Sequence, residues 1–318
     1  MRRSERSIAS AVFLGLCFLL LAAQSARPQG SVGTFTVFDA PGAGTSVLEG
    51  TGSISINAAG DVTGIYLDGN HVAHGFLRTA GGTISTFSAP DAGAGLTQGT
   101  LPISINATDE VTGEYFDSNN AYHGFVRAAD GTITEFDVPG IGTNGHRGTS
   151  PTSINAAGQI TGFYRGADDV YHGFLRAADG TITTFNVPVA ATGSQQGTMP
   201  VSINSNGDIA GVYSDAQRVG HGFVRAADGT FTAPIDAPGA GSSGSVGDKD
   251  LFALGTFPFS IDTAGDITGV YGDANGTRHA FVRSADGTFT APIDTPGAAA
   301  VGEAAVRRIP GRRRAPTR

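Results

Sequence analysis

The chain has 318 residues, a formal net charge of −8, a single cysteine and no tryptophan. Its 48 glycines are about twice the ~7% of an average domain, but no Gly-X-Y period accompanies them, which excludes a collagen-like chain. One lysine and six glutamates leave too few helix-forming residues for a mainly helical protein.

The N-terminus has the layout of a secretory signal peptide. Three arginines in the first six residues precede a predominantly apolar stretch, Ile8–Ala23. The sequence Ala23-Gln24-Ser25 then has the small-x-small form of a cleavage site. We therefore predict a signal peptide over residues 1–25, a linker over 26–33, and a location that is secreted, periplasmic or at the cell surface.

A retained N-terminal anchor is the alternative, but the apolar stretch is shorter than the ~20 residues of a membrane span. We therefore expect no stable membrane insertion after cleavage. Cys17 lies inside the apolar stretch and would leave with the signal peptide. The mature protein would then have no disulfide, no thiolate nucleophile and no thiolate metal site.

The part of the chain between the leader and the C-terminal arginines is strongly acidic. Residues 26–306 contain 11 basic and 27 acidic residues. Such a surface repels phosphate backbones, so we expect no nucleic-acid partner. Residues 298–318 carry six arginines, and we predict a disordered, solvated tail there.

One unit recurs five times between these two ends. The triplet His-Gly-Phe occurs four times and His-Ala-Phe once, with successive spacings of 49, 49, 49 and 58 residues. An arginine follows each histidine at the same distance. The repeated pairs are His74 and Arg78, His123 and Arg127, His172 and Arg176, His221 and Arg225, and His279 and Arg283.

Each unit reads as four short strands, a to d. In the first copy, strand a ends in Ser55-Ile56-Asn57, a turn with Gly60 follows, and strand b is Asp61–Tyr66. Strand c is His74–Arg78; in the second copy, strand d is Thr132–Phe136. The three internal links have the length of hairpin turns, whereas the d–a link has roughly ten residues.

Three short links and one long link predict an antiparallel meander, and meanders repeated around an axis form a β-propeller. The period lies close to the ~50 residues of kelch blades. We therefore predict an all-β protein, a β-propeller of five four-stranded blades over residues 34–297, in preference to a β-solenoid. Strand d occurs six times, so we expect Thr34–Phe38 or Thr288–Asp294 to complete the last blade and lock the ring.

The repeat, Ser-Ile-Asn-x-x-Gly-x-x-x-Gly-x-Tyr followed by His-(Gly/Ala)-Phe-(Leu/Val)-Arg and Asp-Gly-Thr, resembles the HAF repeat of extracellular bacterial proteins. The likeness covers residues 34–297, and His279-Ala280-Phe281 is the literal motif, whereas the first four copies have Gly in place of Ala. The resemblance implies a secreted or surface repeat protein without an established activity. The sorting signal of some relatives is not expected here, because no apolar span precedes the arginine cluster.

We interpret the repeated histidines and arginines as structural. Equivalent residues on different blades lie too far apart to share a metal ion with bonds of about 2 Å. A buried arginine needs a partner, and the aspartate of the following turn is the expected one. These aspartates are Asp130, Asp179, Asp228 and Asp286. A ligand or metal site at the histidines is the alternative, and we predict no catalytic residue, no metal and no cofactor.

We therefore expect a non-catalytic, monomeric, secreted propeller that binds or scaffolds, with a glycan or a surface protein as its partner. The alternative function is a hydrolase or lyase that acts on extracellular polysaccharide. Among the residues outside the repeat, Glu114 and Glu135 could then be an acid/base pair, if their carboxyls lie about 5–9.5 Å apart.

Overall fold

The computed structural model describes residues 35–141, 147–242 and 254–293, and every regular element in these ranges is a β-strand. The predicted signal peptide, the linker and the arginine-rich tail lie outside the described residues. Within the described residues, no helix is long and apolar enough to cross a membrane.

Twenty strands form five antiparallel meanders, numbered 1 to 5 along the chain. The first strands are β1 (Gly50–Ile56), β5 (Gly99–Ile105), β9 (Thr149–Ile154), β13 (Thr198–Ile203) and β17 (Gly255–Ile261). The second strands are β2 (Val62–Leu67), β6 (Val111–Phe116), β10 (Ile160–Arg165), β14 (Ile209–Ser214) and β18 (Ile267–Gly272). The third strands are β3 (Ala73–Arg78), β7 (Tyr122–Arg127), β11 (Tyr171–Arg176), β15 (Gly220–Arg225) and β19 (Arg278–Arg283). The fourth strands are β4 (Ile84–Phe87), β8 (Ile133–Phe136), β12 (Ile182–Phe185), β16 (Phe231–Ile235) and β20 (Phe289–Ile293).

The pairing of strands corrects the prediction of five independent four-stranded sheets. The strands form an eight-stranded, a four-stranded and a second eight-stranded sheet. Each large sheet consists of two meanders joined by one parallel residue pair, Ala73 with Gly99 and Gly220 with Gly255. The same contact is an isolated bridge at the other two junctions, where Tyr122 meets Gly148 and Tyr171 meets Gly197.

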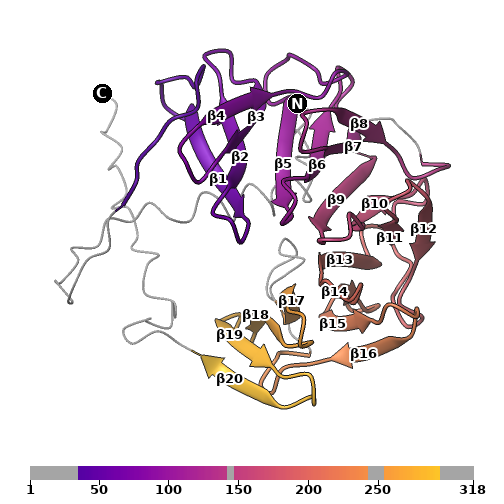
Figure 1. Cartoon of the computed structure of the whole chain (residues 1–318). Coiled ribbons are helices and arrows are strands. Elements are labelled where there is room, and N and C mark those ends of the chain that lie inside the picture. Colours follow the sequence, from indigo (N-terminus) through magenta and orange to yellow (C-terminus); the bar gives the residue numbers. More distant parts are fainter. Residues whose placement is uncertain (1–34, 142–146, 243–253, 294–318) are drawn as a thin grey trace, which may run out of the picture.

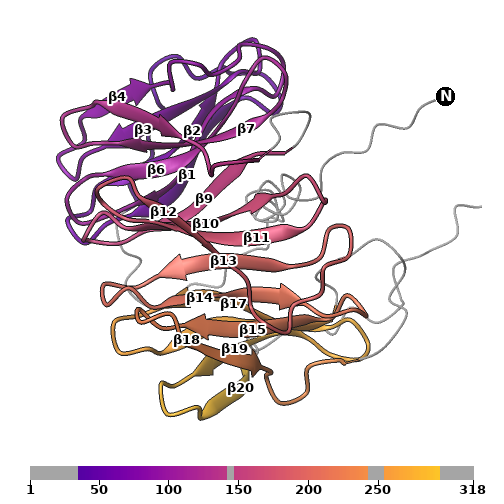
Figure 2. The ribbon, with the colours of Figure 1, turned by 90° about the vertical axis from the view of Figure 1, so that its right-hand side faces the viewer.

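The meanders follow one another along an arc, with their first strands toward its centre and their fourth strands outside (Figure 1). Seen from the side, successive meanders pack face to face (Figure 2). Among the described strands, meander 1 does not pair with meander 5, so the sheets do not close into a ring. The predicted locking of the ring is therefore not observed.

The repeated Phe of the third strand forms the centre of each interface. Phe76, Phe125, Phe174, Phe223 and Phe281 are at most 1% exposed. In meander 2, Phe125 packs edge-on against Phe87 of the preceding meander, with ring centroids 6.1 Å apart. Burial of an aromatic side chain contributes about 2–3 kcal/mol, and the repeat provides it at every junction.

The motif Ser-Ile-Asn connects each meander to the next by hydrogen bonds. The amide of Asn106 donates to the backbone carbonyl of Asn155 at 3.0 Å, and the Ser104 hydroxyl accepts the N–H of Ile154 at 3.3 Å. Equivalent amide bonds start from Asn57, Asn155 and Asn204. At the same time, the Asn106 Oδ1 accepts the N–H of Glu110 and closes its own turn. One side chain therefore shapes a turn and bonds two meanders.

The series of asparagine hydrogen bonds between meanders ends at Asp262, the residue that replaces Asn in the fifth copy. Its Oδ1 still accepts the N–H of Asp266 at 2.9 Å, so the turn is preserved. A carboxylate cannot donate a hydrogen bond, so no bond of this kind can continue to a further meander. The exposure of Phe259 (44%) and Ile293 (43%) agrees with an end face at meander 5.

Of the two terminal copies of strand d, only the C-terminal one forms a strand. Residues 289–293 form β20, which pairs with β19 and completes meander 5. Residues 35–38 are not a strand, yet Phe38 packs edge-on against Phe76 at 5.8 Å, and the Ala40 N–H donates to the Thr51 hydroxyl. The N-terminal copy thus covers the face of meander 1 that a preceding meander covers elsewhere.

We predict that Gly99→Ala destabilises the protein much more than Gly50→Ala. Both glycines have positive φ, 114° and 112°, so an alanine at either position costs about 1–2 kcal/mol of backbone strain. Only at Gly99 would the added Cβ overlap the backbone of Ala73; at Gly50 the nearest atom is 4.0 Å away. The overlap adds about 1–3 kcal/mol. Urea denaturation measures both variants, and equal losses would contradict the role of Gly99 at the junction.

Candidate functional site

Each meander carries a cluster of polar side chains at the end where its second strand turns into its third; we call these the histidine clusters. The imidazole of the third strand stacks on a tyrosine of the second strand, with ring centroids 4.9–5.2 Å apart. An aspartate of the intervening turn faces the Nε2 of the same imidazole at 3.5–3.9 Å. The members are Tyr66, His74 and Asp68; Tyr115, His123 and Asp117; Tyr164, His172 and Asp168; Tyr213, His221 and Asp215; and Tyr271, His279 and Asp273.

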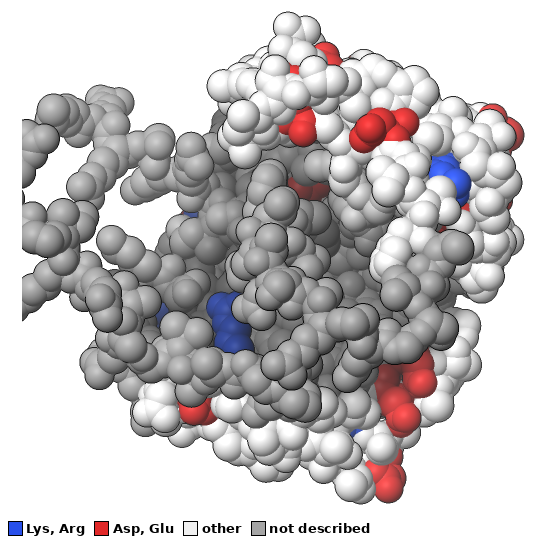
Figure 3. Space-filling model, turned by 90° about the vertical axis from the view of Figure 1, so that its left-hand side faces the viewer, with Lys and Arg blue, Asp and Glu red and all other residues white. Residues whose placement is uncertain are grey.

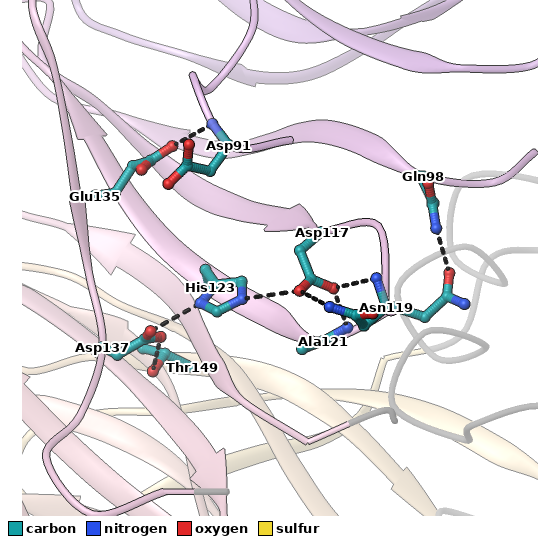
Figure 4. Close-up of polar contacts among 10 residues, drawn as sticks. Asp91, Gln98, Asp117, Asn119, Ala121, His123, Glu135, Asp137 and Thr149 are labelled. Atoms are coloured by element: carbon teal, nitrogen blue, oxygen red, sulfur yellow. Dashed lines mark hydrogen bonds and ion pairs between the residues drawn. The ribbon is translucent and has the colours of Figure 1, made fainter. Parts of the chain in front are cut away.

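Figure 4 shows the cluster of meander 2, whose histidine is His123. His123 lies between two carboxylates: its Nδ1 is 2.7 Å from Asp137 and its Nε2 is 3.9 Å from Asp117. Asp117 also accepts the N–H groups of Asn119 and Ala121, which fixes its orientation. The His123 side chain keeps 14% of its surface exposed, so the cluster lies at the surface and its imidazole is rigidly held.

The partner of the histidine Nδ1 changes from copy to copy. It is Ser88 for His74, Asp137 for His123, Asn186 for His172 and Asp236 for His221, at 2.7–3.0 Å. Asp294, the matching residue of the fifth copy, lies outside the described residues. The clusters therefore share one geometry but differ in charge.

These partners raise the pKa of two imidazoles. The hydrogen bond to Asp137 raises the pKa of His123, burial opposes it, and the charges of Asp137, Asp117 and Glu135 raise it further. The bond to Asp236 raises the pKa of His221 in the same way. Both groups favour the cationic imidazole.

The tyrosines lie deeper than the histidines. Burial raises the pKa of Tyr213 to about 12, and Asp236 and Asp215 add to the effect. Burial also raises the pKa of Tyr115, whose hydroxyl is bonded to Glu135. These hydroxyls therefore stay protonated at neutral pH, and that of Tyr115 can donate to Glu135.

The arginines do not pair with the turn aspartates as predicted. The Arg127 guanidinium lies over the Phe87 ring, 5.1 Å from its centroid, and donates to the Ala128 carbonyl. Asp130 instead accepts the N–H of Thr132 and closes the turn. The stacking recurs with Arg78, Arg176, Arg225 and Arg283. A planar cation over an aromatic face needs no carboxylate. The first copy, which has Gly81 at the position of the aspartate, therefore holds its arginine in the same way.

No group of three or more metal-ligating side chains is suited to hold a metal ion within the ranges that the structure describes. The equivalent histidines lie on separate meanders, one on each third strand. The turn aspartates have their own partners: Asp68, for example, accepts the N–H groups of Asn70 and Val72.

The structure separates Glu114 from Glu135. In the pairing of β6, β7 and β8, Glu114 faces Gly124 and Glu135 faces Phe125. Gly124 and Phe125 are consecutive on one strand, and consecutive residues point to opposite sides of a sheet. The two carboxyls therefore cannot act as the acid/base pair of a glycosidase.

Glu114 belongs to an interface between meanders. It is 8% exposed and accepts a hydrogen bond from Ser150 of β9. At the other junctions both positions are apolar, as in Phe163 with Met199 and Val212 with Phe257. Burial raises the pKa of Glu114 to about 7, against the lowering effect of Ser150. Sequence reasoning noted Glu114 as unusual but could not identify its partner.

We predict that Asp137→Asn lowers the pKa of His123. The variant removes the charge that raises this pKa and leaves an amide, as Asn186 does beside His172. Because the folded-state pKa is raised, this interaction stabilises the protein below pH ~6.5 and is lost as the pH rises through the raised value. NMR titration of the imidazole measures the shift. Asp130→Asn is the control, and an unchanged His123 in the Asp137 variant would contradict the assignment.

We predict that Glu114→Gln stabilises the protein at high pH. The folded-state pKa of about 7 lies above the ordinary 4.5, so wild-type stability falls as the pH rises from ~4.5 to ~7. The full loss is about 3 kcal/mol, and the glutamine variant escapes it. Denaturation at pH 4 and pH 8 measures the difference. Glu135→Gln on the opposite face is the control; a pH-independent difference for Glu114→Gln would contradict the prediction.

Searches of family models and of curated proteins find no match. Solved structures of similar arrangement include virginiamycin B lyase from Staphylococcus aureus, with a TM-score of 0.47 and 15% identity over 77% of this chain and 71% of that chain. TolB from Acinetobacter baumannii has a TM-score of 0.47 and 13% identity over 76% of this chain, which spans about half (53%) of the TolB chain. The Aleuria aurantia lectin, a six-bladed β-propeller, has a TM-score of 0.41 and 13% identity over 78% and 79% of the two chains. Likeness at this level carries no argument about activity or ligand.

Proposed function

We propose that this chain is a secreted, non-catalytic repeat protein whose five meanders are the blades of a β-propeller and whose histidine clusters bind a repetitive ligand. The observation that carries the proposal is the recurrence of one surface cluster in every meander. A structural role alone would need only the buried phenylalanine and the stacked arginine. The histidine clusters instead keep part of each imidazole and of each turn carboxylate exposed.

The chemistry of a histidine cluster suits a hydroxyl-rich ligand. The turn aspartate offers acceptors and the neighbouring imidazole offers a donor or an acceptor, which matches adjacent hydroxyl groups of a sugar. Both groups are oriented by other contacts: the tyrosine stacks on the imidazole, and backbone N–H groups hold the aspartate. A glycan with repeating units could occupy several clusters at once and gain affinity through multivalency.

The same proposal includes points that rest on the sequence alone. The repeat motif favours membership among HAF-repeat proteins, and the leader over residues 1–25 favours export, with a monomer as the working state. The separation of Glu114 from Glu135 weighs against the polysaccharide hydrolase or lyase considered as the alternative. Acidic side chains are scattered over the face shown in Figure 3 and basic ones are few, which fits a partner other than nucleic acid.

The test is a glycan array followed by calorimetry of the mature protein with the oligosaccharide that binds best. We expect saturable binding of more than one ligand per chain without turnover. The double variant His123→Gln/His172→Gln should lower the number of bound ligands by two. His71→Gln is the matched control, because His71 is a surface histidine outside the clusters, 40% exposed and near Glu49.

Two results would overturn the proposal. The first is unchanged stoichiometry in the folded double variant. The second is turnover of a polysaccharide that is lost in Glu135→Gln, which would establish the enzyme instead. Circular dichroism confirms that each variant is folded before its binding is measured.

A further inference from the structure

Three arginines outside the repeat meet at one place on an otherwise acidic protein. The described residues contain four arginines that do not belong to the repeated motif: Arg147, Arg165, Arg218 and Arg278. Arg147 and Arg165 both face the Oδ1 of Asp169, Arg147 at 3.8 Å and Arg165 in direct contact. Arg218 lies beside them, because it donates a hydrogen bond to the backbone carbonyl of Ser194. The hydroxyl of Ser194 in turn donates to Asp169.

The three side chains come from meanders 3 and 4 and from the links before them. Arg165 ends β10, Asp169 lies in the turn after it, and Arg218 lies in the equivalent turn after β14. Arg147 precedes β9, and Ser194 lies in the link before β13. Asp168 of the first turn faces His172 at 3.5 Å, so this arginine cluster adjoins the histidine cluster of meander 3.

The charges of the arginine cluster are not balanced. Arg147 and Arg165 share one carboxylate, and Arg218 donates to a backbone carbonyl instead of a carboxylate. The neighbouring Asp168 and Asp215 face His172 and His221. The side chain of Arg165 is 17% exposed, and its Nε is buried without a hydrogen-bond partner. Arg218 is exposed and Arg147 keeps 34% of its side-chain surface in solvent. The guanidinium groups of Arg147 and Arg218 therefore reach solvent, where they can bind an anion besides their present partners.

Asp169 has the features of an internal counter-ion. Burial raises its pKa. Hydrogen bonds from Arg165 and Ser194 and the charges of Arg165 and Arg147 lower the pKa by more, so that it falls below the ordinary value. Its φ of 70° is one that aspartate and asparagine tolerate better than other residues. The carboxylate thus orders the guanidinium groups and neutralises only part of their charge.

We propose that Arg147, Arg165 and Arg218 form a binding site for an oxyanion, namely a carboxylate or sulfate group on an acidic polysaccharide. Guanidinium groups bind such planar or tetrahedral oxyanions with paired, charge-assisted hydrogen bonds. The site rests on the proposed glycan-binding function and narrows it to an acidic glycan. A chain that lies across the arginine cluster would place its next hydroxyl groups near His172 and Asp168, so one ligand could contact both clusters.

The experiment measures binding by calorimetry to four probes: oligogalacturonate, sulfated dextran oligomers, neutral dextran oligomers and sodium sulfate. Arg147→Gln and Arg218→Gln should each weaken binding of the two acidic oligosaccharides about tenfold, as expected for loss of one charged hydrogen bond. Arg278→Gln, which removes an exposed arginine outside the cluster, is the matched control and should bind like wild type. Binding should also weaken as salt concentration rises.

Asp169→Asn should change the affinity in the opposite direction from the arginine variants. Asparagine keeps the backbone conformation and removes the counter-charge, so this variant should bind the acidic oligosaccharides more tightly than wild type. Equal effects of Arg147→Gln, Arg218→Gln and Arg278→Gln would overturn the site, as would weaker binding in a folded Asp169→Asn variant. Tight binding of sodium sulfate alone would assign the site to a free anion and overturn the polysaccharide assignment.

The outcomes also separate this site from the proposed function. Undiminished binding of the acidic oligosaccharides in the Arg147 and Arg218 variants, with binding lost in His123→Gln/His172→Gln, would support the histidine clusters and overturn the arginine site. Failure of all probes to bind the folded wild-type protein would overturn both proposals.

Discussion

The side-chain amide of the repeated Asn is the contact on which the arrangement of meanders depends. It closes its own turn through Oδ1 and reaches the next meander through Nδ2, so the geometry of one turn sets the position of its neighbour. Both bonds involve buried or half-buried backbone groups, which are costly to leave unpaired. The glycine at or just before the start of the first strand in meanders 2 to 5 allows the close approach that these bonds need, because a side chain there would overlap the preceding third strand.

This constraint also explains where the array stops. Asp262 preserves the turn and removes the donor, and Phe38 with its neighbours covers the opposite end at meander 1. An open series of face-to-face sheets needs such end residues, because an exposed apolar face favours association with other molecules. The segment with Phe38 covers the end at meander 1, whereas Phe259 and Ile293 stay exposed at meander 5.

Departures from the repeat identify the positions where meanders differ in chemistry. Glu114 and Ser150 replace an apolar pair at one junction, and the arginine cluster occupies another. The acidic partners of His123 and His221 raise the pKa values of these two imidazoles. Since the framework is the same in all copies, these few substitutions account for the electrostatic differences along the array.

Part of this could be predicted from the sequence because the signals are local. Strand order within a meander follows from short turns, and Asp109 and Gly60 adopt the positive φ that their turns demand. The predicted pairing of Arg127 with Asp130 is wrong, because Arg127 stacks on Phe87 of the preceding meander, which is distant in sequence. The partner of Glu114 could not be predicted for the same reason, because Ser150 belongs to the next copy.

The sequence by itself determined the all-β class, the five copies and the turn types, because these depend on spacings and on the conformational preferences of single residues. Only the tertiary structure decided that meanders 1 and 5 stay unpaired, that the arginines stack on aromatic rings, and that Arg147 and Arg165 meet at Asp169 with Arg218 beside them. Most of these contacts join residues that are far apart in the sequence, and a repeat period carries no information about the distance between them.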